Sequence, residues 1–410
     1  MSEWSEKKLG DIAETTSGGT PDRKNQAFFG GPIPWVKSGE LEDTFINDTE
    51  EKITPEGLKR SAAKLFPSGT LLMAMYGATV GKTALLKIEA ATNQAVCAIF
   101  PKADQAGTDF LRYALVYQRP EILKLRYGGA QPNISQQVIR NLVVPLPPLA
   151  EQRKISGVLG LVQRALEQQE RLIALTTELK KALLYQLFTQ GLRGEPQKQT
   201  EIGPVPQSWE VVKFAEVVDI KNGQVDPTVA PFDAMLHVGP ENIESNTGRL
   251  TELRNNAELR ISSGNYHFTP DDVLYSKIRP YLNKAALPDF EGTCSADMYP
   301  LRAKAGQFIR TYLFQMLLSE PFKKQAVSFQ DRTGIPKINR AQLGSILLPR
   351  PSITEQQDIS DCLATCDRKV EVHFGKHAAL TALFRTLLHQ LMTAQLRVHA
   401  LDLSEIPEHV

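Results

Sequence analysis

The chain has 410 residues and a formal net charge of +1, and 42% of its residues are hydrophobic while 23% are charged. This composition is typical of a soluble protein long enough for two domains, and it neither favours nor excludes a nucleic-acid partner. No apolar run reaches the roughly 18 residues of a membrane span, and the first residues lack the apolar stretch of a signal peptide. We therefore expect a cytoplasmic protein with no membrane partner.

Residues 1–148 have the pattern of a mixed α+β domain. Short apolar runs bounded by glycine and proline predict strands at 33–41, 70–77 and 95–102, and a helix is predicted at 110–128. A glycine-rich turn and one more strand lead through Pro147 and Pro148 into the next segment.

Residues 149–190 predict one long helix. No proline occurs between Pro148 and Pro196, and about 42 residues at 1.5 Å each give a rod of roughly 63 Å. Apolar residues follow alternating steps of three and four, which is the pattern of a coiled-coil seam. The predicted seam residues are Ile155, Val158, Val162, Ala165, Leu172, Leu179 and Leu183, with interruptions at Gln169, Thr176 and Gln186. Taken alone, such a rod is typical of a dimerisation or spacer helix.

The remainder of the chain repeats this order of elements. Residues 191–208 are rich in proline and glycine and are predicted to be a linker. A second mixed domain follows at 209–352, with strands predicted at 232–243, 273–282 and 296–304 and a helix at 307–327. A second rod is predicted at 353–397, and residues 398–410 are expected to form a loose tail.

The two rods are copies of one another. Residues 174–193 and 378–397 are identical at ten of twenty positions with a constant offset of 204, and the same offset relates Glu151-Gln152 to Glu355-Gln356. The approach to each rod is also repeated, since 143–155 matches 347–359. We interpret the chain as a tandem duplication of a unit of about 200 residues rather than a short solenoid repeat.

Basic residues gather at matching places in both copies. Residues 122–150 contain Lys124, Arg126 and Arg140 and no acid, and residues 273–288 contain Lys277, Arg279 and Lys284 and no acid. The equivalent of the first stretch in the second copy, residues 321–354, has six basic residues against Asp331. Such clusters suit contact with phosphates, although solvated surface lysines would give the same pattern.

Motifs for catalysis are incomplete. Residues 77–83 read Gly-x-x-x-Gly-Lys-Thr, one residue short of a phosphate-binding loop, and the second copy has no such loop. Pro21-Asp22 with Glu50-Glu51-Lys52 loosely resembles the metal site of a nuclease, but the pattern is short. The spacing of Cys362 and Cys366 suits small core side chains better than metal ligands. We predict no catalytic, cofactor-binding or metal-binding residues.

These residues together resemble the DNA-specificity subunit of type I restriction–modification systems. The resemblance rests on the Leu-Gly-Asp-Ile opening within 4–21, on the Pro-x-Ile segments at 128–142 and 332–343, on the repeated proline-rich entry ending in Glu-Gln, and on the linker between the rods. It covers nearly the whole chain. The second copy departs from the pattern where Arg350 and Ser352 replace Leu146 and Pro148, and where Ile335 replaces Gln131.

The resemblance implies an α+β fold with a pseudo-two-fold internal repeat, in which two target-recognition domains are separated by two long antiparallel coiled-coil helices. Each domain would read one half of a bipartite DNA target, and the helices would set the spacing. It also implies two methyltransferase subunits that use S-adenosylmethionine to methylate adenine, and restriction subunits that use ATP and Mg²⁺. The chain itself would hold no cofactor and carry no activity.

The candidates for DNA contact are polar and basic residues in matching loops, because Arg and Lys suit guanine edges and phosphates while Gln and Asn suit adenine. They are Lys37, Ser38, Tyr76, Lys82, Gln131 and Asn133 in the first domain, and Lys277, Arg279, Tyr281, Asn283, Lys284, Lys337 and Asn339 in the second. The alternative function is a structural coiled-coil adaptor that does not bind DNA, and a nuclease or NTPase comes third.

Overall fold

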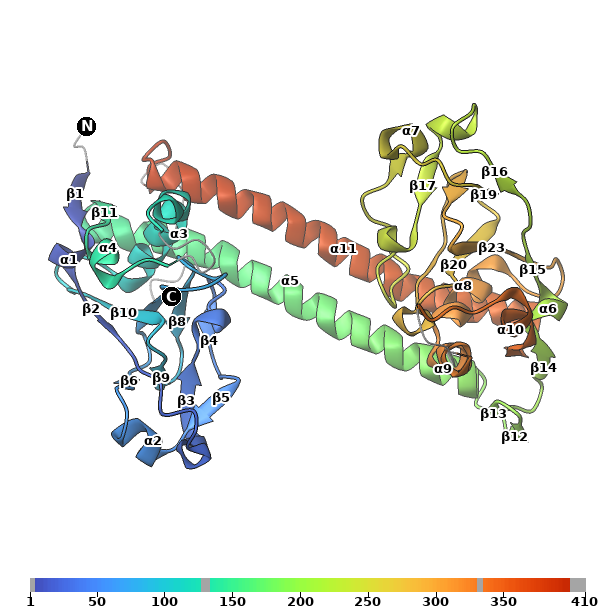
Figure 1. Ribbon diagram of the computed structural model, residues 1–410, viewed down its shortest axis with the longest axis horizontal. Coiled ribbons are helices and arrows are strands. Elements are labelled where there is room, and N and C mark those ends of the chain that lie inside the picture. Colours follow the sequence, from blue (N-terminus) through green and yellow to red (C-terminus); the bar gives the residue numbers. More distant parts are fainter. Residues whose placement is uncertain (1–3, 127–132, 330–334, 399–410) are drawn as a thin grey trace. The chain divides into compact units, whose positions relative to one another are not determined.

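The computed structural model describes residues 4–126, 133–329 and 335–398. The chain divides into two compact units: unit 1 is Met1–Gln169 with Lys376–Val410, and unit 2 is Glu170–Gly375. Each unit therefore contains one globular part and portions of two long helices, α5 (Leu149–Gln190) and α11 (Ile353–Met392), which are drawn in green and red in Figure 1.

The globular part of unit 1 contains β-strands in three sheets with short helices between them. Its elements are β1 (Ser5–Lys8), α1 (Leu9–Ile12), β2 (Ala13–Ser17), β3 (Phe29–Val36), β4 (Phe45–Ile46), β5 (Glu51–Ile53), α2 (Pro55–Lys59), β6 (Leu65–Phe66), β7 (Leu71–Ala74), β8 (Thr83–Leu86), β9 (Ala90–Thr92), β10 (Val96–Pro101), α3 (Thr108–Lys124), α4 (Gln136–Arg140) and β11 (Val143–Leu146). The sheet orders are β1-β11, β2-β10-β7-β8-β4 and β5-β3-β9-β6.

Unit 2 repeats this plan. Its elements are β12 (Gln197–Thr200), β13 (Gly203–Pro206), β14 (Glu210–Lys213), α6 (Phe214–Val217), β15 (Val218–Ile220), β16 (Gln224–Val225), β17 (Leu236–Val238), β18 (Arg254–Asn255), α7 (Asn256–Leu259), β19 (Asn265–Phe268), β20 (Asp272–Ser276), β21 (Ala285–Ala286), β22 (Gly292–Cys294), β23 (Met298–Ala303), α8 (Arg310–Leu318), α9 (Glu320–Ser328), α10 (Arg340–Ser345) and β24 (Leu347–Arg350). The sheet β15-β23-β20-β21 matches β2-β10-β7-β8 strand for strand, and β14-β24 matches β1-β11.

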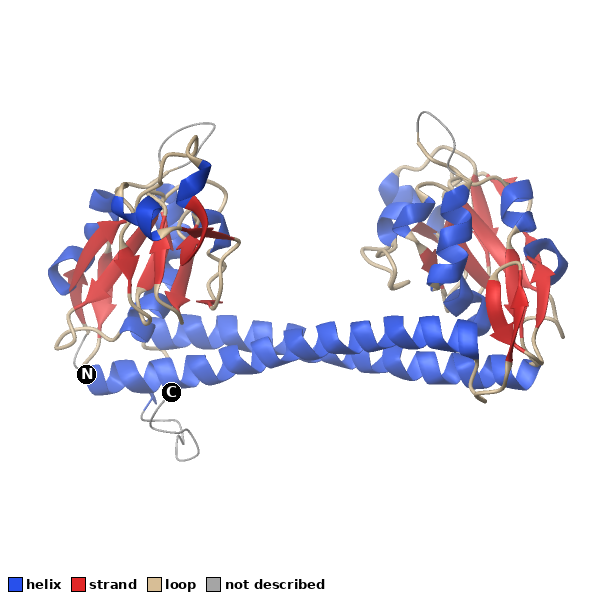
Figure 2. Ribbon diagram, turned by 90° about the horizontal axis from the view of Figure 1, so that it is seen from below, coloured by secondary structure: helices blue, strands red, loops and turns tan. Residues whose placement is uncertain are grey.

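The central strand of each sheet is buried along its whole length because both of its faces are covered. Every residue of β7 and every residue of β20 is buried. In Figure 2 helices flank the strands of each globular part. The same apolar clusters extend onto the long helices, which is how each sheet is fixed to its helix pair.

The long helices run antiparallel. In unit 1 Ile155 and Leu159 of α5 join the same apolar cluster as Leu391 near the end of α11. In unit 2 Leu184 and Leu187 of α5 join one cluster with Ile359 near the start of α11. The predicted fold class, with two α/β domains and two long antiparallel helices, is confirmed. No helix in the described ranges combines the length and the apolarity needed to cross a bilayer.

The packed face of α5 differs in part from the predicted seam. Ile155, Val158 and Val162 are buried as predicted, but Leu172 and Leu179 are 39% and 53% exposed. The inward positions there are Ile173, Lys180 and Leu187. A seam chosen by hydrophobicity misses Lys180, whose ammonium lies 2.6 Å from Asp367 Oδ1 and is thereby neutralised within the helix pair.

Several predicted elements differ in extent. The strand predicted at 232–243 is reduced to β17 between two 3₁₀ turns, and the strand predicted at 273–282 ends at Ser276. The strand predicted at 33–41 ends at Val36 and is followed by a 3₁₀ turn at Ser38–Glu40. The second rod ends at Met392 instead of 397. The helix predicted at 307–327 is two helices, because Ser319 leaves the helical conformation and caps α9 by accepting a hydrogen bond from Phe322 N. The segment 191–208, predicted to be a linker, contains the hairpin β12-β13, and its Val205 joins the core of unit 2.

Candidate nucleic-acid interface

The repeated Glu-Gln pair attaches each globular part to its long helix. Gln152 Oε1 accepts a hydrogen bond from Gly107 N at 2.8 Å, and Gln356 Oε1 accepts one from Ile309 N at 2.9 Å. Each amide also donates to two carbonyls: Gln152 to Gln105 and Pro147, and Gln356 to Gln307 and Pro351. Both glutamines are buried. In each unit the same three contacts therefore attach the globular part to the start of a long helix.

The neighbouring glutamates hold a tryptophan in each unit. Glu151 accepts a hydrogen bond from Trp4 Nε1 at 3.2 Å, and Glu355 accepts one from Trp209 Nε1 at 3.2 Å. Unit 1 adds a cation, since Arg397 lies 3.3 Å from Glu151 and over the Trp4 ring. In unit 2 the second Glu355 oxygen instead accepts a bond from Leu192 N at 3.4 Å.

The candidate residues after the central strand lie beside those that precede the short helix α4 or α10. In unit 1 Tyr76 pairs with Asn133 in a single antiparallel bridge, and Ile134 N donates to Met75 O at 2.9 Å. In unit 2 Ile278 pairs with Lys337, and Ile338 N donates to Lys277 O at 2.9 Å. We call each such pair of adjoining segments, 75–82 with 133–134 and 277–284 with 336–339, a composite loop.

Two further candidates of unit 1 belong to the same region. Ser38 O accepts a hydrogen bond from Thr79 Oγ1 at 2.7 Å, which brings the turn at 38–40 against the composite loop. Tyr76 is 43% exposed and presents its ring to solvent. The structure therefore brings Lys37, Ser38, Tyr76, Lys82 and Asn133 into one region, while Gln131 lies outside the described residues.

The lysines of unit 1 are held by carboxylates. Lys37 Nζ lies 2.7 Å from Glu50 Oε2 and 3.1 Å from Glu51 Oε1, and these hydrogen bonds raise the pKa of Lys37 above its usual value. Lys82 pairs in the same way with Glu42. Both lysines are thus charged and already partnered, so contact with a phosphate would exchange one anion for another.

The candidates of unit 2 have different surroundings. Arg279 and Tyr281 are exposed, and Arg279 adopts a positive φ of 49°. Lys284 Nζ donates to Pro240 O at 2.6 Å, and Asn339 caps α10. Lys277 and Lys337 both approach Asp297, at 3.9 and 3.6 Å.

Among the predicted contacts that fall in the described residues, Asn283 is the one whose side chain is buried. It is only 1% exposed, and its amide donates to Leu318 O at 3.0 Å. Its positive φ of 49° shows why an asparagine suits this turn. We therefore leave Asn283 out of the interface, since its sequence position alone does not reveal that its side chain points inward.

Glu50, Glu51 and Lys52 of the nuclease-like pattern are engaged in ion pairs, and Asp22 accepts a hydrogen bond from Lys24 N. Glu51 pairs with Arg23 and Lys37, and the hydrogen bond from Arg23 is the largest influence lowering the pKa of Glu51. Lys52 pairs with Asp48 at 3.1 Å. Among residues 4–126, 133–329 and 335–398, no three acidic, His or Cys side chains are grouped so as to hold a metal.

Two polar clusters behind the interface carry no signal in the sequence. In unit 1 Asp43 O accepts from Arg112 Nη1 at 3.1 Å, and Gln163 Oε1 of α5 accepts from Arg112 Nη2 at 2.8 Å. The Asp43 carboxylate pairs with Arg119, which also donates to Gly81 O. This cluster connects the composite loop with α5.

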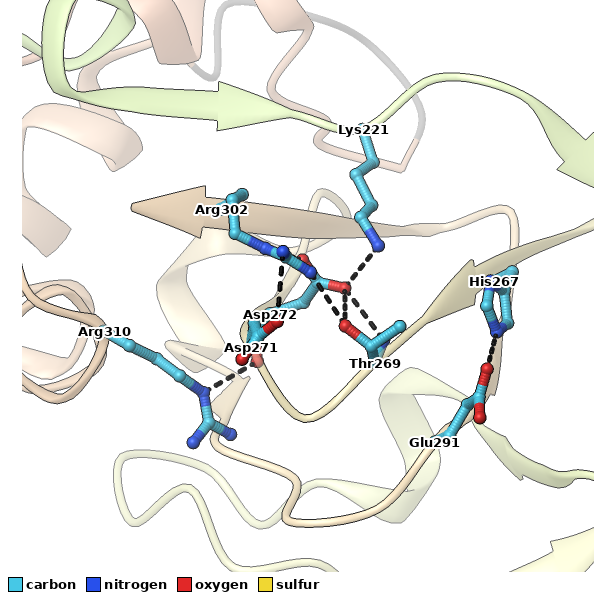
Figure 3. Close-up of polar contacts among 8 residues, drawn as sticks. All are labelled: Lys221, His267, Thr269, Asp271, Asp272, Glu291, Arg302 and Arg310. Atoms are coloured by element: carbon cyan, nitrogen blue, oxygen red, sulfur yellow. Dashed lines mark hydrogen bonds and ion pairs between the residues drawn. The ribbon is translucent and has the colours of Figure 1, made fainter. Parts of the chain in front are cut away.

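In unit 2 the fully buried Asp272 lies at the centre of the cluster in Figure 3. Its oxygens accept from Lys221 Nζ at 2.6 Å, Arg302 Nε at 2.7 Å and Thr269 N at 2.8 Å. Burial alone would raise the pKa of Asp272, but the bonds with Arg302 and Lys221 hold that pKa below its usual value. At neutral pH Asp272 is therefore a charged support of β20.

Comparison with known proteins identifies a repeated family match. A family model described as the type I restriction modification DNA specificity domain matches residues 1–177 and again residues 206–382. The EcoDI specificity subunit of Escherichia coli is 28% identical over 275 residues, which cover 62% of this chain and 61% of that relative. The MjaVIII specificity subunit of Methanocaldococcus jannaschii is 22% identical over 425 residues, which cover 98% of this chain and 94% of that relative.

Solved structures share the fold. The S subunit of a type I restriction–modification system from M. genitalium matches with a TM-score of 0.62 at 15% identity, covering 95% of this chain and 96% of that one. A chain from a study of assembly and conformational transition in a type I system matches with a TM-score of 0.55 at 18% identity, covering 96% and 98%.

Proposed function

Because the chain belongs to the family of type I restriction modification DNA specificity domains, we propose that it selects the DNA target of an adenine-methylating and restricting assembly. Its relatives are named as specificity subunits, which are the non-catalytic components of these enzymes. In this proposal unit 1 reads one half-site and unit 2 reads the other. The chain supplies recognition, and S-adenosylmethionine, ATP and Mg²⁺ are bound by its partners.

The observation that carries the proposal is the composite loop, which occurs in both units with the same backbone pairing. Ile134 N donates to Met75 O, and Ile338 N donates to Lys277 O, both at 2.9 Å. The two loops share this backbone but differ in their side chains, as expected if one scaffold presents different groups to two different half-sites. Lys37, Tyr76 and Lys82 in unit 1, and Arg279, Tyr281 and Lys337 in unit 2, are the side chains we assign to DNA.

The partner surface is assigned to the outward face of α5. Leu172, Leu175 and Leu179 are 39%, 54% and 53% exposed and follow one another at helical spacing. Three exposed leucines on one stripe suit a helix from another chain. We assign this stripe to the methyltransferase subunits, with the restriction subunits joining the same assembly in the cytoplasm.

The first experiment maps methylated adenines in the genome of the source cell with and without this gene. A bipartite motif that disappears with the gene is the expected result. Replacing residues 1–148 by the corresponding domain of a relative should change one half-site and leave the other half-site and the spacer unchanged. If both half-sites change together, the units do not read independently.

The second experiment tests whether α5 and α11 set the spacer. One heptad inserted after Glu178 in α5 and another after Arg368 in α11 lie on the same side of the Lys180–Asp367 pair in the antiparallel helices, so the seam keeps its register. Each helix becomes longer by about 10 Å, so the spacer should grow by roughly three base pairs. The same heptad placed at the turn of the β12-β13 hairpin is the control and should leave the spacer unchanged. An unchanged spacer in an active double-insertion variant would contradict the role of the helices.

Two rival functions give different results. The purified chain should show no methyltransferase, nuclease or ATPase activity, and a turnover abolished by Lys82→Ala or Glu50→Ala would support an enzyme. A structural adaptor would show no salt-dependent binding of a duplex by the assembled complex, whereas a specificity subunit should lose affinity steeply as salt rises.

A further inference from the structure

Asp297 lies between two lysines of the composite loop in unit 2. Its Oδ1 is 3.9 Å from Lys277 Nζ and 3.6 Å from Lys337 Nζ. Both distances exceed the roughly 3.2 Å limit of an N–H···O hydrogen bond. The carboxylate therefore attracts both ammonium groups without forming a hydrogen bond with either, and a phosphate could displace it.

The backbone fixes the three residues beside one another. Lys277 N donates to Asp297 O at 3.0 Å, and Ile338 N donates to Lys277 O at 2.9 Å, so three separate segments meet at Lys277. The backbone N–H of Asp297 also donates a hydrogen bond to Ser295 Oγ at 3.2 Å. The Lys277 ammonium also lies over the Tyr299 ring, 5.6 Å from its centroid. The charges are thus held at defined positions on the loop.

Unit 1 has the same backbone arrangement without the charges. Met75 N donates to Ala95 O at 2.8 Å, and Ile134 N donates to Met75 O at 2.9 Å. The residues that correspond to Lys277, Asp297 and Lys337 are therefore Met75, Ala95 and Asn133. The shared backbone arrangement therefore forms in unit 1 with neutral residues at all three positions.

We propose that Asp297 is a specificity-determining residue of unit 2. By pairing with Lys277 and Lys337 it keeps them from binding the phosphates of any duplex, and the two lysines exchange Asp297 for phosphates only at the correct half-site. This inference rests on the proposed function. Phosphates are the same in every sequence, so two unrestrained lysines would add affinity for all DNA and reduce discrimination. At the correct half-site, contacts from the rest of the composite loop offset the loss of the Asp297 pairs.

Asp297→Asn tests the proposal, because asparagine keeps the size and the backbone bonds of Asp297 and removes only the charge. Binding of the assembled complex that contains the full chain is measured on the duplex found by methylation mapping and on a scrambled duplex of equal length, between 50 and 200 mM salt. Affinity for the scrambled duplex should rise by up to about five-fold, as expected when an exposed ion pair stops competing. The slope of its log affinity against log salt should steepen by about 1 to 2, since up to two lysines become available. Affinity for the mapped duplex should rise less, so that discrimination falls.

Asp219→Asn is the matched control. Asp219 lies on β15 of the same unit and pairs with a single lysine, Lys304, at 3.5 Å. The substitution changes the net charge of the chain by the same amount but should leave discrimination unchanged. Adding Lys337→Ala to Asp297→Asn should return the affinity for the scrambled duplex towards that of the parent.

The possible outcomes separate this inference from the proposed function. If Asp297→Asn behaves like Asp219→Asn, the restraint does not exist. If Asp297→Asn weakens only the mapped duplex, Asp297 contacts a base and the restraint is wrong. If the assembled complex with the parent chain does not prefer the mapped duplex, the proposed function fails, and this inference fails with it.

Discussion

The same position in the central sheet is charged in unit 2 and neutral in unit 1. In unit 2 Asp272 of β20 lies opposite Arg302 of β23, and Lys221 completes the cluster. The matching register in unit 1 places Thr70 beside β7 and Phe100 on β10. Thr70 Oγ1 donates only to Pro67 O at 2.7 Å, and Phe100 packs against Phe66.

The difference shows which interactions the repeated fold requires. Four strands of the central sheet share their order and register in both units, and so do the glutamine contacts on the long helices, whereas the buried ion cluster occurs in one unit. A buried ion pair is weak evidence for stability, because desolvation offsets much of its attraction. Once the ion cluster has formed, however, removing one charged side chain leaves the remaining buried charges unpaired.

The glutamine contacts should matter equally in both units and should give the largest effect. Gln152→Ala and Gln356→Ala each leave three backbone groups without their partner, and we expect each to lower the free energy of unfolding of its own unit by about 3–5 kcal/mol. Hydrogen exchange of the first turns of α5 and of α11 measures the two losses separately. Gln186→Ala, at an exposed position of α5, is the control and should change little. If only one of the two variants had a much lower free energy of unfolding, the glutamine contacts would not be equivalent in the two units.

The ion cluster should matter in unit 2 alone. Asp272→Asn should lower the free energy of unfolding of that unit by about 2–3 kcal/mol, because three donors lose a charged acceptor. Thr70→Val in unit 1 removes one neutral hydrogen bond and should cost about 1 kcal/mol. Hydrogen exchange of β20 and of β7 reports the two effects. Equal losses would show that the charge of Asp272 adds nothing to the common fold.

Acid should reproduce part of the Asp272→Asn effect. The folded pKa of Asp272 is lowered, so its contribution to stability is complete above the unfolded value of about 3.9 and is lost as pH falls through the lower folded value. Between pH 5 and pH 3, β20 should therefore lose protection while this group contributes nothing to any loss in β7. The Asp272→Asn variant should lack this component of acid sensitivity. If its acid sensitivity equals that of the parent, another group is responsible.

The glutamates next to the two glutamines should give the smallest difference. Glu151→Gln removes an ion pair with the partly exposed Arg397, so we expect a cost of about 0.5 kcal/mol that disappears at high salt. Glu355→Gln removes no charged partner among the contacts of Glu355, and its effect should be independent of salt. Thermal unfolding at 0.05 and 0.5 M salt compares the two variants. A salt-dependent effect of Glu355→Gln would contradict the assigned contacts.

Much of the fold could be predicted because the sequence repeats. The offset of 204 and the absence of proline locate both long helices, and the Glu-Gln pairs mark where they begin. The packed face of α5 was harder to predict, because the inward position 180 is a lysine and the outward position 179 is a leucine. A proline-rich segment gave no sign of the hairpin at 197–206, whose strands pair mainly through the backbone.

The sequence predicted which loops contain the candidate site, but it did not predict how their side chains are placed. The duplication makes the two loops of each unit correspond, but the pairing of Tyr76 with Asn133 is visible only in the structure. The burial of Asn283 depends on a backbone with positive φ, and the pairing of Lys37 with Glu50 and Glu51 depends on how two turns pack. Neither leaves a periodic pattern in the sequence. Asp297 was missed for the same reason, because it becomes part of the composite loop only through a hydrogen bond between strands.

The contacts of the two buried glutamines also bear on how such a chain can diverge. Gln152 and Gln356 bind only main-chain atoms of the globular parts, namely the amides of Gly107 and Ile309 and the carbonyls of Gln105, Gln307, Pro147 and Pro351. Main-chain atoms are present whatever residue occupies a position, so substitutions at these positions leave the attachment intact as long as the backbone path is kept. Gly107 in one unit and Ile309 in the other already illustrate this tolerance. A gene segment that encodes a foreign globular part could thus recombine at this junction and keep these hydrogen bonds without any change at Gln152 or Gln356.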